Sequence, residues 1–276
     1  MSRLPNRLIA ALDVATNELD LIECEDPDSK DNKQYLFNQL GEICAVLESN
    51  GYINGINSEV SELLSQHKIL TYRCLELDNI NYPKTYVLDD LQNSNKLAAA
   101  LNWVRFFADQ VGYPVVVKPN QGSHSQGVQV IHNYLDLIKY ISKHSDSQSD
   151  LIVQEYIPGP EFKVVLHGYE IVIAYEKTSS ELIKPYRRGE TREVKFVTPA
   201  MHEYLIHAAT SLRLNYCSID IKTPSLDYFD QNNTYILELN CHPGINFMLN
   251  EKGPTFVRGL YKKLILDVIS SCKINK

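Results

Sequence analysis

The chain has 276 residues, of which 44% are hydrophobic and 22% are charged, and its formal net charge is −7. Such a chain can bury one large core or two to three small lobes, so disorder along its whole length is excluded. The acidic balance argues against a general nucleic-acid surface, which needs a basic footprint.

Other features of the sequence bear on location and on cysteine chemistry. No apolar run approaches the roughly 20 residues that span a bilayer, and the first residues contain no signal-peptide core. We therefore expect a soluble, cytoplasmic protein without a membrane partner. The six cysteines include no Cys-x-x-Cys pair, so neither a zinc site nor a disulfide framework is indicated. A nucleophile pair of Cys241 and His242 is disfavoured, because adjacent strand residues point apart.

The front of the chain is short. The first 62 residues are expected to form a partial N-terminal domain, with helices near residues 33–50 and 58–66. Apolar residues at helical spacing then predict a helix over residues 95–111, which should pack on the small sheet that follows it. Further stripes indicate helices whose apolar faces belong to the core, near residues 134–141, 201–212 and 256–268.

A small polar loop lies between two β-branched runs at residues 113–131. It begins at Gly122 and ends at Gly127, which predicts a hairpin with a long turn whose N–H groups can contact phosphate oxygens. Lys118 ends the first strand and could meet a phosphate as a point charge. The loop is not a Walker A sequence, since Val128 follows its second glycine. An ordinary turn with an exposed lysine is the alternative interpretation.

The next feature is a break between two strands. A strand at residues 151–157 runs into Pro158-Gly159-Pro160, and a new strand begins with Glu161. We interpret the break as a hinge between two lobes. Backbone groups at such a hinge can bond the edge of an adenine, and a carboxylate just beyond it can accept hydrogen bonds from ribose hydroxyls.

Oxygen donors gather near the end of the chain. The alternating pattern of Tyr235–Asn240 places Glu238 and Asn240 on one face of a strand, and a Pro-Gly turn follows. Asp220 lies in another short apolar run, 18 residues before Glu238. These donors suit Mg²⁺, which usually keeps positions for water and nucleotide phosphates. An edge strand with solvated polar residues is the alternative.

Taken in this order, the segments resemble the ATP-grasp superfamily of carboxylate-amine ligases. The hinge and C-terminal segments are most similar to its D-alanine ligase, cyanophycin synthetase and RimK-like branches, and the resemblance covers about residues 63–270. It implies an α/β (α+β) ATP-grasp fold, in which two lobes with antiparallel sheets clasp ATP behind a short partial N-terminal domain. The implied limits are 1–62 for that region and 63–272 for the ATP-grasp domain, with lobes of about 82–157 and 158–272.

The resemblance also implies site residues. Lys68 occupies the place of the family's first lysine and Lys118 that of the Val-Lys-Pro lysine, so both would bind phosphates. The metal ligands would be Asp220, Glu238 and Asn240. The other nucleotide contacts would come from the loop, the hinge and the start of the next strand: Gly122, Ser123, His124, Ser125, Gly127, Glu155, Tyr156, Ile157, Glu161 and Lys163.

One arginine of the D-alanine ligase pattern is missing. It lies two residues before the metal aspartate, where this chain has Ser218, so a D-Ala-D-Ala product is disfavoured. RimK-like and glutathione-synthetase-like relatives take their arginine from the region between the hinge and the metal strand. In that region the catalytic candidates are Arg187, Arg188 and Arg192, and a solvated charged loop is the alternative.

The sequence therefore predicts an ATP-dependent ligase. It would transfer the γ-phosphoryl of ATP to a carboxylate and join the acylphosphate to an amine, with ADP and phosphate released. Its cofactors would be ATP with one or two Mg²⁺ ions, for which Mn²⁺ could substitute, and its substrates would be small molecules or peptides. A small-molecule kinase and a non-catalytic nucleotide-binding protein are the alternatives. A homo-oligomer, or a partner that completes the short N-terminal region, is compatible with the sequence.

Overall fold

The computed structural model of the protein describes residues 22–25, 33–39, 42–48, 52–91, 94–122, 127–144, 150–178 and 191–274. Side chains are described from residue 52 onward, apart from those of 94–96 and 272–274. Within these ranges, no helix is long and apolar enough to cross a membrane.

The N-terminal sheet is a series of antiparallel strands, β1 (Ile22–Glu25), β2 (Lys33–Gln39), β3 (Glu42–Glu48) and β4 (Ile53–Asn54). The helix predicted near residues 33–50 is wrong, because β2 and β3 pair with each other across this segment. Its apolar residues fall in two short runs that contain the β-formers Tyr35, Phe37 and Val46, with Gly41 between them. Such short runs do not separate a helix from a hairpin, and here pairing between the strands prevails.

Two helices follow this sheet, α2 (Glu59–Gln66) and α3 (Lys68–Leu77). The helix predicted near residues 58–66 is confirmed, and the Ser58 side chain caps it by accepting a backbone N–H at 3.1 Å. His67 has an extended backbone, which ends α2, and it forms an isolated β-bridge with Gln121. Lys68 therefore begins α3 directly beside the loop that contains Gln121.

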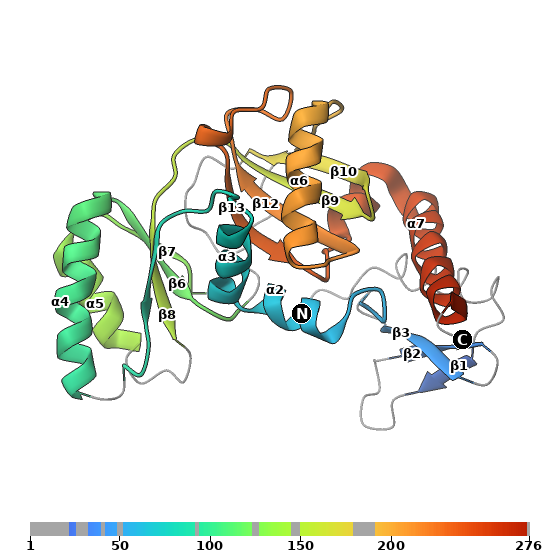
Figure 1. Ribbon diagram of the computed structural model, residues 1–276, viewed down its shortest axis with the longest axis horizontal. Coiled ribbons are helices and arrows are strands. Elements are labelled where there is room, and N and C mark those ends of the chain that lie inside the picture. Colours follow the sequence, from blue (N-terminus) through green and yellow to red (C-terminus); the bar gives the residue numbers. More distant parts are fainter. Residues whose placement is uncertain are drawn as a thin grey trace.

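The small lobe consists of β5 (Thr85–Leu88), α4 (Ser94–Val111), β6 (Val115–Pro119), β7 (Gln129–Ile131), α5 (Tyr134–His144) and β8 (Leu151–Glu155). Its antiparallel sheet has the order β5-β8-β6-β7, and both helices lie along one side of it (Figure 1). The predicted hairpin is confirmed by the pairing of β6 with β7. The predicted helix over 95–111 is confirmed too, since Val104 and Ala108 are fully buried in one cluster with Val115 and Val117.

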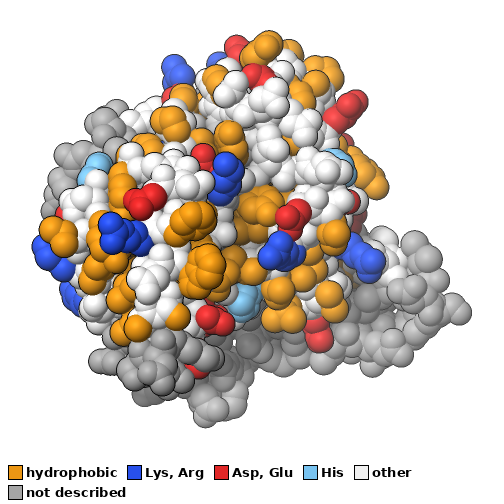
Figure 2. All heavy atoms as spheres, turned by 60° about the vertical axis from the view of Figure 1, so that its left-hand side comes forward, with side chains coloured by type: hydrophobic (Ala, Val, Ile, Leu, Met, Phe, Trp, Pro, Cys, Tyr) orange, Lys and Arg blue, Asp and Glu red, His pale blue; other side chains and the backbone are white. Residues whose placement is uncertain are grey.

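The outer face of the small lobe carries exposed hydrophobic side chains. Trp103 and Phe106 on α4 are 60% and 59% exposed, and Leu135 on α5 is 68% exposed. Figure 2 brings this side of the molecule forward and shows hydrophobic side chains spread across it. They lie on the solvent sides of helices whose other sides form the core of the lobe.

The larger lobe consists of β9 (Glu161–His167), β10 (Glu170–Lys177), β11 (Thr191–Glu193), α6 (Pro199–Ser211), β12 (Tyr216–Lys222), the short 3-10 helix η1 (Gln231–Asn233), β13 (Tyr235–Asn240) and α7 (Asn246–Ile274). Its antiparallel sheet has the order β11-β10-β9-β12-β13. Alternation along β9 places Val164 in the core beneath α6 and Val165 in the core beneath α7. The two helices therefore cover opposite faces of this sheet, and α7 bends at Gly253, where φ is +79°.

The mixed α/β class, with two lobes built on antiparallel sheets, agrees with the predicted fold class. Strand β8 of the small sheet leads through residues 156–160 into β9 of the larger sheet, so the segment interpreted as a hinge joins the lobes (Figure 1). The predicted domain limits stay predictions. This connection positions the ends of β6 and β8 opposite β9, β12 and β13.

Candidate functional site

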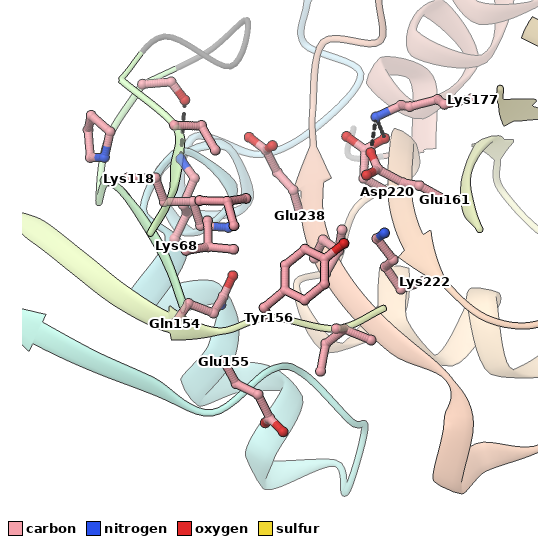
Figure 3. Close-up of a pocket in the computed structure, with 17 residues that line it drawn as sticks. Lys68, Lys118, Gln154, Glu155, Tyr156, Glu161, Lys177, Asp220, Lys222 and Glu238 are labelled. Carbon is pink, nitrogen blue, oxygen red and sulfur yellow. Dashed lines mark hydrogen bonds and ion pairs between the residues drawn. The ribbon is translucent and has the colours of Figure 1, made fainter. Parts of the chain in front are cut away.

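A cavity of about 200 Å³ lies between the two lobes (Figure 3). Strands β6, β7 and β8 and the first residue of α3 form one wall, and β9, β10, β12 and β13 form the other. Part of the lining is apolar, with Val116, Val130 and Leu237. The charged lining residues are Lys68, Lys118, Lys177, Lys222, Glu155, Glu161, Asp220 and Glu238. Apolar walls beside clustered charges suit a ligand that has a flat apolar part and an anionic tail.

Lys68 and Lys118 are the cations of the small-lobe side, and they are only 7% and 8% exposed. Lys68 Nζ donates to the backbone carbonyls of Asn120 at 3.4 Å and Gly122 at 3.3 Å. Lys118 Nζ donates to the hydroxyl of Tyr72 at 3.4 Å. Burial lowers the pKa of both lysines, and the negative charge of Glu238 offsets part of that shift. Both ammonium groups are therefore desolvated cations whose hydrogen bonds go to neutral oxygens.

Asp220 is the centre of an ion-pair cluster on the larger lobe (Figure 3). Its carboxylate lies 2.9 Å from Lys163 Nζ and 2.9 Å from Lys177 Nζ, and Lys177 also pairs with Glu161. Burial on its own raises the pKa of Asp220, but the two lysines outweigh it and lower that pKa to about 2. Burial on its own lowers the pKa of Lys177, but Asp220 and Glu161 raise it above its ordinary value. These ion pairs therefore keep Asp220 and Lys177 charged.

Two of the predicted metal ligands meet at the cavity. Asp220 and Glu238 are paired neighbours on β12 and β13, and both line the cavity. Asn240 does not line it, and its Oδ1 accepts from the backbone N–H of His242 at 2.9 Å. Among the described residues, no three His, Cys, Asp or Glu side chains are arranged to hold a metal ion. Two carboxylates fit a hard cation such as Mg²⁺ when phosphate oxygens complete its shell. Metal binding by Asp220, Glu238 and Asn240 stays a prediction.

The hinge supplies the wall that connects the lobes. Glu155, Tyr156 and Ile157 line the cavity. The Glu155 carboxylate accepts from the backbone N–H of Lys84 at 3.3 Å, and its side chain points away from the charged cluster (Figure 3). Lys222 Nζ lies 5.8 Å from the centroid of the Tyr156 ring and donates to the carbonyl of Gly159 at 2.8 Å. Lys222 thus fastens the hinge to β12.

The remaining candidates lie at the edges of the site or beyond the described ranges. Gly122 lines the cavity, and Gly127 has a φ of +70° with only 3.0 Å between its missing Cβ position and Pro119. Glycine is therefore the residue that fits at position 127. Arg192 is 75% exposed and pairs with Glu176 at 2.5 Å, and it does not line the cavity. Five candidates lie outside the described residues: Ser123, His124, Ser125, Arg187 and Arg188.

Sequence reasoning missed four residues that the structure brings to the site or its support: Tyr72, Gln154, Lys177 and Lys222. Tyr72 and Gln154 lie within a helix and a strand, where their patterns indicate only core positions. Lys177 and Lys222 are the last residues of their strands, and a lysine at a strand end was the signal by which the sequence could have marked them as site residues. Their role follows only from the strand register. Strand β9 lies between β10 and β12, and its residue Glu161 is paired with both Lys177 and Lys222.

The family model of the RimK-like ATP-grasp domain matches residues 62–255. The chain belongs to this family. The match includes the hinge, both lysine segments and the strands β12 and β13, so it covers every wall of the cavity.

Known ligases share this fold. A D-alanine-D-alanine ligase A of Bacillus cereus is 24% identical over 211 residues, which are 74% of this chain and 66% of that protein. A probable alpha-L-glutamate ligase 2 of Hahella chejuensis is 22% identical over 235 residues, which are 82% of this chain and 72% of that protein. The crystal structure of D-alanine-D-alanine ligase from Bacillus anthracis complexed with ATP aligns with a TM-score of 0.54 at 19% identity, over 79% of this chain and 68% of that chain. The chain has the ATP-grasp fold and spans about two thirds of the length of the first of these relatives.

Proposed function

We propose that the protein is an ATP-dependent ligase that joins a carboxylate to an amine through an acylphosphate, with release of ADP and phosphate. Membership of the family and the ligase names of its relatives support this reaction class. The observation that carries the proposal is the cavity between the lobes. Two buried lysines on the small-lobe side of the cavity face the carboxylates of the larger lobe, which suits a nucleoside triphosphate bound with a divalent cation.

The nucleotide would lie along the hinge. Its base would contact the apolar lining and the backbone of Tyr156 and Ile157, and its ribose would reach Glu161, where β9 begins. Its phosphates would meet Lys68 and Lys118, whose ammonium groups carry positive charge without a carboxylate partner among the described residues. A polyanion would relieve the unfavourable burial of these charges.

Asp220 and Glu238, with Asn240 as the further proposed ligand, would hold one or two Mg²⁺ or Mn²⁺ ions. A bound divalent ion neutralises phosphate charge in such sites. The contribution of the chain itself is to keep the carboxylate ready. Lys163 and Lys177 hold Asp220 in its ionised form, with a pKa of about 2.

The proposed reaction has two displacements. A carboxylate oxygen of the first substrate attacks the γ-phosphorus, and the bond between that phosphorus and the β,γ-bridging oxygen breaks as ADP leaves. The amine nitrogen of the second substrate then attacks the acyl carbon, phosphate leaves, and the nitrogen loses a proton. Positioning and charge neutralisation carry the rate in such transfers. Arg187, Arg188 or Arg192 would stabilise the acylphosphate oxygens.

The substrates would be an amino acid or peptide carboxylate and an amine of the same class. Relatives named as D-alanine and glutamate ligases support this class. Ser218 stands where D-alanine ligases have an arginine, which disfavours a D-Ala-D-Ala product.

A screen of amino-acid and peptide pairs for ADP release tests the proposal. A ligase forms ADP quickly only when both substrates are present, and hydroxylamine should trap the acylphosphate as a hydroxamate when the amine is omitted. A stable product that retains the phosphate would contradict the ligase proposal and would favour a small-molecule kinase instead. Absence of ATP binding by calorimetry at millimolar nucleotide with Mg²⁺ would overturn the nucleotide site itself.

A further inference from the structure

Tyr72 connects the two sides of the cavity without lining it. It lies on α3, is 2% exposed, and stacks on Tyr82 with ring centroids 4.9 Å apart. Its hydroxyl donates to the carbonyl of Leu237 at 2.8 Å. The same hydroxyl accepts from Gln154 Nε2 at 3.0 Å and from Lys118 Nζ at 3.4 Å.

The directions of these hydrogen bonds follow from the groups involved. A phenol hydroxyl has one hydrogen and two lone pairs, and a backbone carbonyl can only accept. The hydrogen of Tyr72 therefore goes to Leu237, and its lone pairs receive Gln154 and Lys118. Gln154 is held in turn, because its Nε2 also donates to Thr85 Oγ1 at 2.8 Å. The hydroxyl of Tyr72 is saturated within the protein and has no bond left for a ligand.

We infer that Tyr72 is a positioning residue that fixes the Lys118 ammonium group relative to the strand that carries Glu238. Leu237 immediately precedes Glu238 on β13, whereas Lys118 is the next-to-last residue of β6 in the other lobe. One hydroxyl thus sets the spacing between the lysine proposed to bind phosphate and the strand proposed to bind metal. The inference rests on the proposed function, since it assumes that Lys118 meets a phosphate.

The strength of this link comes from burial. Hydrogen bonds to charged groups contribute more than those between neutral groups, and an ammonium that loses its partner in a buried site is poorly solvated. Without the hydroxyl, Lys118 would shift to find another acceptor and would no longer be aligned with the phosphates. A ligand without phosphates would be unaffected, because the hydroxyl does not reach the cavity.

The test compares Tyr72→Phe with Tyr82→Phe, which removes the hydroxyl of the stacked neighbour. Calorimetry of the full-length chain measures the affinity for AMP-PNP with Mg²⁺, and ligand-observed NMR measures the affinity for adenosine. We expect Tyr72→Phe to weaken AMP-PNP binding by about tenfold and to leave adenosine binding unchanged. Tyr82→Phe should bind both ligands as the wild type does.

A double-mutant cycle with Lys118→Met separates positioning from general damage. If Tyr72 acts through Lys118, Tyr72→Phe should cause no further loss of AMP-PNP affinity in the Lys118→Met background. An equal loss for adenosine and AMP-PNP, or an additive loss in the double variant, would overturn the inference.

Two further outcomes keep the test decisive. If Tyr72→Phe does not fold, Gln154→Met removes a hydrogen bond that holds the hydroxyl, and we expect about threefold weaker AMP-PNP binding. Wild-type affinity in Gln154→Met would then count against the inference. If the wild type binds AMP-PNP no more tightly than adenosine, the proposed function itself is contradicted. If the wild type binds AMP-PNP more tightly and Tyr72→Phe has the same AMP-PNP affinity, only the role of Tyr72 is contradicted.

Discussion

The two sides of the cavity hold their lysines in opposite ways. On the small-lobe side, Lys68 and Lys118 are buried and donate to neutral oxygens, and burial lowers the pKa of each. On the larger-lobe side, Lys163 and Lys177 pair with Asp220, and the pKa of Lys177 is raised despite burial. On the small-lobe side, the two lysines have no carboxylate partner among the described residues, whereas on the larger-lobe side Asp220 and Glu161 are already paired with lysines.

This difference indicates what kind of ligand, anion or metal cation, each side of the cavity would favour. A buried cation without a counter-ion destabilises the empty protein, so an arriving polyanion gains affinity from it. Paired carboxylates behave differently, because a divalent cation must compete with the lysine that already neutralises them. Lys177 bridges Asp220 and Glu161 (Figure 3), and we propose that its ammonium group lies where such a cation would bind. Nucleotide and metal are therefore expected to bind together, since phosphates would offer Lys177 a new partner.

The largest expected effect comes from Glu238, whose charge acts on both lysines of the small-lobe side. Glu238→Gln keeps the size of the side chain and removes its charge. We expect ADP production at saturating Mg²⁺ to fall by about a hundredfold or more, because the metal contact proposed for Glu238 would contribute several kcal/mol. Glu170→Gln, which breaks an exposed pair with Lys263, is the matched control and should be fully active. Comparable turnover in both variants would show that Glu238 does not bind a catalytic metal ion.

The next prediction compares the two sides of the cavity by the free energy of unfolding of the protein without nucleotide. Lys177→Met leaves Asp220 and Glu161 without their shared cation, and we expect the free energy of unfolding to fall by about 2 kcal/mol. This estimate lies below that for a fully buried pair, because 33% of the Lys177 side chain is exposed. Lys118→Met removes a buried cation without a counter-ion, so stability should stay the same or rise. Urea denaturation at pH 7.5 measures both, and equal losses would contradict the distinction between the two sides.

A third effect concerns the divalent cation. If the Lys177 ammonium group lies where a metal ion would bind, Lys177→Met should make that position available to the metal. Mn²⁺ at about 5 mM should then stabilise Lys177→Met more than it stabilises the wild type. We expect an additional shift in Tm of roughly 2–4 °C, which corresponds to about 1 kcal/mol for a protein of this size. Lys252→Met, which breaks the pair with Glu193 on the same lobe, is the control and should shift as the wild type does. The same Tm shift in all three proteins would show that Lys177 does not occupy a metal site.

Much of the fold could be predicted because its signals are local. The β6–β7 hairpin, the strands on either side of the hinge and the helix α4 follow from periodicity and turn residues that lie close together in sequence. The N-terminal strands could not be predicted as well, because residues 33–48 have short apolar runs that fit a helix and a hairpin equally. In that segment, pairing between strands decides the structure, and a single sequence does not show it.

The candidate site shows the same limit at the level of side chains. Asp220 and Glu238 could be placed together because each is an oxygen donor within a short apolar strand, and the structure pairs them directly. The roles of Tyr72 and Lys177 depend on which strands are neighbours, and the hydroxyl of Tyr72 meets groups 46, 82 and 165 residues away. Sequence spacing carries no record of such contacts.

The smallest expected effect concerns His167, a titratable group on β9 that lies outside the cavity. Its Nε2 is 2.9 Å from the carboxylate of Asp267 on α7, so it links the sheet to that helix. Burial lowers the pKa of His167 below its ordinary value of 6.5, although Asp267 offsets part of the shift. The nearby Lys263 lowers this pKa further and Glu170 raises it.

The sign of the pH dependence follows from this direction. As the pH falls through 6.5, the unfolded chain takes up a proton at this position before the folded protein does, so stability falls until the lower folded-state pKa is passed. His167→Gln should therefore lose less stability than the wild type between about pH 7.5 and 5.5, measured by urea denaturation at each pH. His207→Gln, on the exposed side of α6, is the matched control and should keep the wild-type slope. A wild-type slope in His167→Gln would mean that the proton uptake on unfolding comes from other groups, and that the contact between β9 and α7 does not depend on a neutral imidazole.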